Sequence, residues 1–349
     1  LAYFPEKSSV MLPVSGVVPS VLGTMSIQIV WAALNLNGAR VGGQVELSLA
    51  IAEGARTTTR ANLELGPSPY VTGSPLDPKH GHSLFFGRDM IIQNVARQIS
   101  AQGNVVLLEG NRRAGKTSIL KHLEGKSAIP GWLAVYSSLQ GAEGAKDAVG
   151  VPTVEVFRSM AGSIASAVSR QGMEVPLPNG TTIPKGKPAL GIAKACREGI
   201  SPDSPFEDFR EYLQIVLDVL QPANLGILLM LDEFDKLQEG IDNHVTSPQV
   251  PENIRYLIQN VPRFSAILTG SRRLKRLREE YWSALYGLGT SLQVTALDVA
   301  SARKVVTEPV AGRLTYSNEA VEKILEATAR QPYLIQCWCG RIFDDSVQT

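Results

Sequence analysis

The segment "VVLLEGNRRAGKTSILKHL", from Val105 to Leu123, decides the fold. An apolar run typical of a buried strand leads into the pattern Gly110-x-x-x-x-Gly115-Lys116-Thr117, and an amphipathic helix follows. Glycines at these places let a loop wrap closely, so that its backbone N–H groups converge on an anion. The start of the helix adds a favourable dipole. The order strand, loop, helix therefore predicts a phosphate-binding loop. The alternative is a glycine-rich turn that merely joins a strand to a helix.

The residue types of this loop match a nucleotide triphosphate and a divalent cation. Lys116 is expected to bridge the β- and γ-phosphates, and Thr117 is expected to ligate Mg²⁺. The expected cofactors are therefore ATP and Mg²⁺. The residues expected to contact the nucleotide here are Gly110, Asn111, Arg112, Arg113, Ala114, Gly115, Lys116, Thr117 and Ser118.

A second segment, "ILLMLDEFDKL", supplies the carboxylates that such a loop needs. Its apolar run predicts a buried parallel strand that ends at Asp232 and Glu233. Asp232 can hold Mg²⁺ through water, and Glu233 is placed to polarise the attacking water as a general base. The alternative is that both acids only cap the next helix.

The next apolar segment, "FSAILTG", ends at Ser271-Arg272-Arg273. Arginine matches the geometry of a phosphate well, so Arg272 is a candidate to touch the γ-phosphate and report its presence. The equally weighted alternative is an ordinary solvated arginine at the start of a helix.

Composition narrows the class of protein. The chain has 349 residues, 44% of them hydrophobic and 19% charged, which suits two or three globular domains. The net charge of +1 gives no signal for nucleic acid or for a membrane surface. The three cysteines are too few for a disulfide framework and are expected in the core of a reduced, cytoplasmic protein. In the uncharged region between Lys7 and Arg40, the longest run without proline or glycine, 24–36, is shorter than the roughly 20 residues of a membrane span, so no span is expected.

The chain changes character along its length. Residues 1–65 are β-rich, with clean alternation in "VELSLAIAEG", and the proline-rich residues 66–82 suggest a linker. From 83 onward strands alternate with helices, which predicts a parallel sheet covered on both faces. The expected strands are 104–109, 132–138, 226–231, 264–269 and 291–295, and the expected helices are 89–101, 116–124, 153–169, 206–220, 253–260, 274–286, 299–308, 317–329 and 331–345. We divide this part into a core, 83–296, and a helical lid, 297–349, and read the Gly/Pro/Lys-rich stretch 171–205 as a partly disordered surface insertion.

With these segments in place, the chain resembles the AAA+/STAND group of P-loop ATPases from about Leu84 to Phe343. Phe85-Phe86-Gly87-Arg88 is similar to the "hhGR" box of that group, which lies beside the adenine. The resemblance therefore implies nucleotide contacts for Phe86, Gly87 and Arg88. "LDEFD" is similar to the Walker B segment.

The lid carries a further part of the resemblance. "ARQPYLIQCWC" is similar to a "GGxPYLLQ" segment whose proline approaches the nucleotide, which here is Pro332. The usual glycine pair is replaced here by Ala329-Arg330-Gln331. The resemblance implies an α/β P-loop NTPase of the ASCE/AAA+ type with sheet order 5-1-4-3-2, a catalytic glutamate and a helical lid, preceded here by the small β-rich domain.

Two functions follow from the resemblance. The first is a nucleotide-controlled switch of STAND type, in which ATP closes the lid and the closed form oligomerises or signals, in prokaryotic defence or stress. It implies ATP and ADP as ligands and a homo-oligomer or a larger complex with protein partners. The second is a DNA-handling ATPase of the origin-recognition or transposition-helper kind. DNA handling needs a clustered basic surface, for which the only dense candidate is "RRLKRLR", Arg272–Arg278, so the near-zero net charge favours the switch.

Overall fold

The computed structural model describes residues 23–34, 40–51, 66–78, 84–100, 105–125, 129–141, 149–185, 189–270 and 289–348. The chain divides into two compact units, Leu1–Glu64 and Leu65–Thr349. Arg272, the cluster Arg272–Arg278 and the predicted helix 274–286 fall outside the described residues.

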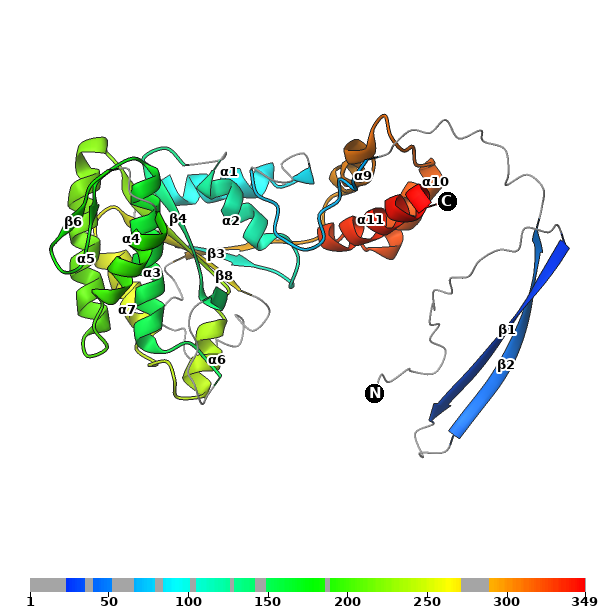
Figure 1. Cartoon of the computed structure of the whole chain (residues 1–349), viewed down its shortest axis with the longest axis horizontal. Helices are drawn as coiled ribbons and strands as arrows, with labels where there is room; N and C mark the ends of the chain where they lie inside the picture. Colours follow the sequence, from blue (N-terminus) through cyan, green and yellow to red (C-terminus); the bar gives the residue numbers. More distant parts are fainter. Residues whose placement is uncertain are drawn as a thin grey trace. The chain divides into compact units, whose positions relative to one another are not determined.

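The described part of the first unit is an antiparallel hairpin. Strand β1 (Gly23–Leu34) pairs with β2 (Arg40–Ile51) along the full length of both strands (Figure 1). Val30 and Val45 are both exposed. The β-rich prediction therefore corresponds here to a single two-stranded sheet.

The second unit is built on a parallel sheet of five strands. The strands are β3 (Val105–Glu109), β4 (Trp132–Ser138), β7 (Gly226–Asp232), β8 (Phe264–Gly270) and β9 (Gly289–Gln293). Their order is β9-β3-β8-β7-β4, which in chain order reads 5-1-4-3-2. The predicted fold class is thus confirmed. Because all five strands are parallel, the ends of β3, β7 and β8 meet at one edge of the sheet.

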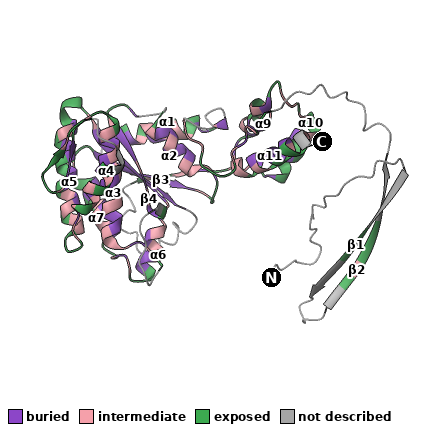
Figure 2. Ribbon diagram, in the orientation of Figure 1, coloured by how far each residue is buried: buried purple, intermediate pink, exposed green. Residues whose placement is uncertain are grey.

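Alternate residues of a strand face opposite sides of the sheet, and in the three inner strands β3, β8 and β7 both sides are buried (Figure 2). Leu229 and Leu231 of β7 join one apolar cluster, whereas Leu228 and Met230 join the other. This explains why these inner strands have mostly apolar sequences, whereas the edge strand β9, GTSLQ, does not.

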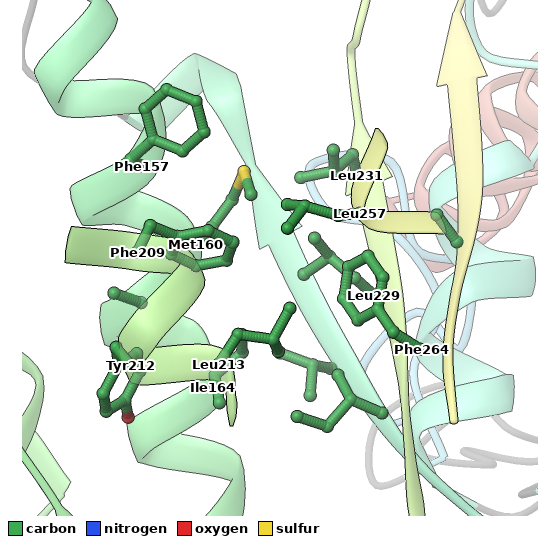
Figure 3. Close-up of a cluster of buried hydrophobic side chains, with 14 of the residues drawn as sticks. Phe157, Met160, Ile164, Phe209, Tyr212, Leu213, Leu229, Leu231, Leu257 and Phe264 are labelled. Carbon is green, nitrogen blue, oxygen red and sulfur yellow. The ribbon is translucent and has the colours of Figure 1, made fainter. Parts of the chain in front are cut away.

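Helices cover both faces. The first face carries α3 (Thr153–Arg170), α5 (Pro205–Leu220) and α7 (Val250–Asn260). The second carries α1 (Asp89–Ser100) and α2 (Lys116–Glu124). Figure 3 shows side chains of the first face converging from α3, α5, α7 and the sheet: Phe157, Met160, Ile164, Phe209, Tyr212, Leu213, Leu229, Leu231, Leu257 and Phe264.

The stretch 171–205 is part of the core, so the prediction of a partly disordered surface insertion is wrong for its described residues, 171–185 and 189–205. It forms a short hairpin, β5 (Val175–Pro176) with β6 (Thr182–Ile183), and helix α4 (Ala189–Glu198). Helix α4 contacts α3 (Figure 1). Five side chains from the stretch are buried in the cluster of the first face: Val175, Leu177, Ile192, Cys196 and Ile200. Because glycines, prolines and lysines separate these apolar residues, the sequence of this stretch shows no regular apolar pattern.

The lid consists of α9 (Val299–Thr307), α10 (Asn318–Ala327) and α11 (Pro332–Gln348) around its own apolar cluster. Helices α9 and α10 begin with side-chain caps. Asp298 accepts from the Ser301 backbone N–H at 2.9 Å, and Ser317 accepts from that of Ala320 at 3.1 Å. These caps fix where the two helices start. Within the described ranges, no helix has both the length and the apolar character needed to cross a membrane.

Residues 66–78, predicted as a linker, are extended but bound to the rest of the unit, and we call them the strap. The Tyr70 hydroxyl donates to the Val306 carbonyl of the lid at 2.6 Å. Further along, the Leu76 N–H donates to Ser118 Oγ in α2 at 3.0 Å. The strap therefore connects the lid to the helix that follows the phosphate loop.

Candidate functional site

The loop between β3 and α2 has the backbone that its glycines predict. Gly115, directly before α2, has φ 98°, and Arg113 also lies in the left-handed region at φ 65°. At Gly110 an added Cβ would lie 2.5 Å from the Val294 carbonyl oxygen, so only glycine fits between β3 and the exit of β9. The first backbone N–H groups of α2, which have no partner within the helix, are available to an anion.

Lys116 is held at the edge of this loop. Its ammonium donates to the Gly110 carbonyl at 3.0 Å and to the Asn111 carbonyl at 2.9 Å. Burial lowers the pKa of Lys116, while the nearby Asp232, Asp235 and Glu233 carboxylates favour its charged form. A partly desolvated ammonium at this place is suited to bind a phosphate oxygen.

Asp232 is buried at the end of β7, and three hydroxyls hold its carboxylate. Thr117 donates to Oδ2 at 2.7 Å, Tyr136 donates to Oδ2 at 3.1 Å, and Thr269 donates to Oδ1. Burial and the Asp232 charge raise the pKa of Tyr136, so its hydroxyl remains a donor at neutral pH. The three donors come from α2, β4 and β8, which the strand order brings to one edge of the sheet.

The residues predicted as metal ligands fit Mg²⁺. The Thr117 hydroxyl and the Asp232 carboxylate are hard oxygen donors in direct contact beside the loop. Magnesium is usually held by one or two carboxylates together with waters and substrate phosphates. Among the described residues, no group of three or more His, Cys, Asp or Glu side chains is arranged to hold a metal.

Glu233 follows Asp232 in a strained backbone conformation, with φ 54°. Its N–H donates to Asp232 Oδ1 at 3.1 Å and to Thr269 Oγ1 at 3.3 Å, which keeps the turn in place. Its Oε2 atom is buried without a hydrogen-bond partner among the described residues. Burial, followed by the charges of Asp232 and Asp235, raises the pKa of Glu233. Such a carboxylate is suited to accept a proton.

Core, lid and strap together line a cavity of about 650 Å³. The predicted nucleotide contacts that line it are Arg112, Arg113, Gly115, Lys116, Thr117, Ser118 and Pro332. The predicted catalytic residues Asp232 and Glu233 line it as well. The predicted contacts that do not line it are Phe86, Gly87, Arg88, Gly110, Asn111 and Ala114. Arg272 lies outside the described residues, so its role stays a prediction.

The segment that resembles the hhGR box supports the loop and the lid. Arg88 is buried, and its Nη2 donates to the carbonyls of Ala114 and Thr295, each at 2.9 Å. At Gly87, where φ is 69°, an added Cβ would lie 2.5 Å from Ser301 Oγ at the start of α9. Phe86 packs against the apolar cluster of the lid. These residues therefore position the phosphate loop and α9, and nucleotide contact by Phe86, Gly87 and Arg88 stays a prediction.

The lid reaches the phosphate loop through α11. The Arg113 guanidinium lies 4.0 Å from the centroid of the Tyr333 ring, within the range of a cation–π contact. The turn before α11 places Ala329 at φ 45° and Arg330 at φ 56°, both left-handed. Glycine adopts such angles without steric cost, so Ala329 and Arg330 take a conformation here that favours glycine.

Several residues that line the cavity were not predicted from the sequence. Thr269 lies near the end of β8, beside β3, and Tyr136 lies toward the end of β4, the edge strand beside β7. Polar residues near the carboxyl ends of parallel strands were an available signal. Gln140, Asp235 and Lys236 line the cavity from loops and helix starts. The strap contributes residues 71–76, for which its proline-rich sequence gave no signal.

No family model matches the chain, and no curated protein matches it either. Solved structures are similar in fold. A Walker-type ATPase of Pyrococcus abyssi, PABY2304, is 14% identical with a TM-score of 0.55, over 80% of this chain and 72% of that one. Cdc6p from Pyrobaculum aerophilum is 15% identical with a TM-score of 0.46, over 75% and 61%. A STAND protein with a tetratricopeptide repeat sensor from Pyrococcus horikoshii is 14% identical with a TM-score of 0.37, over 71% and 28%. The likeness to the Walker-type ATPase PABY2304, together with the strand order, shows that the chain has the fold of a P-loop ATPase.

Proposed function

We propose that the chain is a Mg²⁺-dependent ATPase module of AAA+/STAND type whose lid responds to the bound nucleotide. One observation carries this proposal: Lys116, Thr117, Asp232 and Glu233 line a single cavity together with Pro332 of the lid. The cavity volume of about 650 Å³ suits a nucleotide-sized ligand.

In this proposal each polar group has one task. Lys116 and the first turn of α2 bind the β- and γ-phosphates. Thr117 and Asp232 would hold Mg²⁺, which when bound neutralises charge on the phosphate oxygens. Glu233 accepts a proton from the attacking water, and its raised pKa suits that task. Tyr136 and Thr269 keep the Asp232 carboxylate in position.

The switch depends on contacts between lid and core. We propose the core as 83–296 and the lid as 297–349. Arg113 touches Tyr333, and the strap links both parts because the Val71 N–H donates to Gln336 Oε1 of α11 at 3.0 Å. A ligand shifts a conformational equilibrium only by its differential affinity for the two states. Arg272 is our candidate for the contact that exists with ATP and not with ADP.

Hydrogen exchange over residues 317–345 tests the switch. We expect protection to differ between ATP analogue, ADP and no nucleotide, while helix α5, whose Tyr212 and Leu213 are fully buried in the core, stays unchanged. Identical protection of 317–345 in all three states would mean a static lid. The DNA-handling function would then be examined by salt-dependent DNA binding with the Arg272–Arg278 cluster neutralised.

We further propose that the ATP-bound form self-associates or joins protein partners, in the cytoplasm, in prokaryotic defence or stress signalling. The support is the resemblance of the lid and Walker B segments to STAND ATPases. Light scattering of the Glu233→Gln variant with ATP and with ADP tests this. A larger mass with ATP supports it, and equal masses contradict self-association.

A further inference from the structure

A second polar pocket lies beside the nucleotide cavity. Its volume is about 320 Å³, and its lining residues come from α2, β4, α3 and α4. Tyr136 lines both cavities. Nothing in the proposed ATPase reaction uses this pocket.

The pocket has an excess of positive charge. Among the described residues, Lys121, Arg170 and Arg197 line it, against one lining carboxylate, that of Glu124. Glu124 is shared, because Lys121 lies 3.3 Å from Oε2 and Arg170 lies 2.7 Å from Oε1. Lys121 and Arg170 thus share the Glu124 carboxylate, and each has further N–H groups that can donate to another acceptor.

The third cation repeats this arrangement. Arg197 contacts Glu155, and Arg158 contacts the same carboxylate at 3.0 Å. The Glu155 side chain is 10% exposed, whereas that of Arg197 is 33% exposed. The carboxylate is therefore less exposed than Arg197, which lines the pocket and has N–H groups beyond the one that contacts Glu155.

Small polar residues of α3 complete the lining. Ser159, Ser163 and Ser166 all line the pocket. Ser166 donates to the Gly162 carbonyl at 2.8 Å, while Ser163 has no hydroxyl hydrogen bond to any described residue. At Gly162 an added Cβ would lie 3.2 Å from Arg197 Cγ, so the absence of a side chain at this position leaves room for the Arg197 side chain. Guanidinium groups and hydroxyls in a concave site match the oxygens of a phosphate.

We propose that this pocket binds the phosphate group of a small free molecule, at a site distinct from the nucleotide cavity. Its position couples it to Asp232. The Lys121 ammonium lies 3.4 Å from the centroid of the Tyr136 ring, and the Tyr136 hydroxyl donates to Asp232. A phosphate that draws Lys121 from the ring acts on the residue that positions Asp232.

The test titrates pyrophosphate into the full chain after saturation with Mg²⁺ and ADP, which occupies the phosphate loop. We expect calorimetry to show one binding event. Arg170→Gln, at a side chain that is 53% exposed, should weaken it about ten- to hundredfold without affecting the fold. The matched control is Lys194→Gln in α4, which removes the same charge from an exposed side chain outside the pocket and should leave the affinity unchanged.

Two results would overturn the proposal. One is the absence of pyrophosphate binding after ADP saturation, and the other is equal weakening in Arg170→Gln and Lys194→Gln. A third arm adds a single-stranded oligonucleotide. If it displaces pyrophosphate and binds more tightly through Arg170, the pocket is part of a nucleic-acid surface, and the assignment to a small molecule is wrong.

Discussion

The Thr117 hydroxyl donates to Asp232 Oδ2 at 2.7 Å, which joins the two motifs that stand 115 positions apart in the chain. Thr117 lies in the first turn of α2 and Asp232 at the end of β7. Strand β8 lies between β3 and β7 and supplies Thr269 to the same carboxylate. The sheet order therefore places a hydroxyl and a carboxylate together where a phosphate-bound Mg²⁺ is expected.

Replacement of Lys116 tests nucleotide binding. Lys116→Ala removes a charge-assisted contact worth about 1.5–3 kcal/mol, so ADP and ATP affinity should fall roughly ten- to hundredfold by calorimetry. Lys323→Ala, at an exposed lysine in α10, is the control and should bind normally. Unchanged nucleotide affinity in Lys116→Ala would show that this loop does not bind the phosphates of the nucleotide.

The pH dependence of kcat/KM tests Glu233 as a base. The pKa of Glu233 is raised, and a base acts when deprotonated, so activity should rise with pH through a limb above the ordinary range of a glutamate. Asp235 raises this pKa and Lys236 lowers it. Asp235→Asn should therefore move the limb to lower pH, and Lys236→Gln should move it to higher pH. Shifts in the same direction for both variants would exclude Glu233 as the titrating group.

The contact between Arg113 and Tyr333 predicts a graded effect on nucleotide affinity. Tyr333→Phe keeps the ring over which the guanidinium lies and should bind ADP normally. Tyr333→Leu removes the ring and should weaken ADP binding about two- to fivefold, because the lid is then less firmly held against the loop. Equal affinity in both variants would show that the cation–π contact does not secure the lid.

The left-handed turn before α11 predicts a stabilising substitution. Ala329 has φ 45°, which disfavours a residue with a Cβ. Ala329→Gly should raise the free energy of unfolding by about 0.5–1 kcal/mol in denaturant titrations. The matched control, Ala327→Gly, replaces an exposed alanine with helical backbone in α10 and should give no gain or a loss of up to about 1 kcal/mol. A loss of stability in both variants would show that the turn is not strained.

Sequence patterns predicted the fold and the candidate site where the physical role of a residue type depends on its local sequence alone. The glycines and lysine of the loop, and the apolar run that ends at Asp232, indicated the site because strand order and loop shape depend on them directly. The helix α2, Lys116–Glu124, was predicted with its observed bounds.

Sequence patterns did not predict the role of a residue where contacts with distant parts of the chain determine that role. Arg88 carries no local sign that it donates to Ala114 and Thr295, far along the chain. The buried residues Ile192 and Cys196 are separated by polar and small residues, and only packing on α3 shows their role. The strap likewise has no periodic pattern, since it is extended and held by separate contacts: hydrogen bonds of Tyr70 and Val71 to the lid and of Leu76 to α2.

Turnover of the Glu233→Gln variant with Mg²⁺ and ATP tests the central claim most directly. The change keeps the shape of the side chain and removes the base. We predict ATP affinity close to that of the wild type and a turnover at least about a hundredfold lower. Asp235→Asn, which changes a neighbouring lining carboxylate in the same way, should retain most of the activity. Full turnover in Glu233→Gln together with loss of turnover in Asp235→Asn would contradict the account.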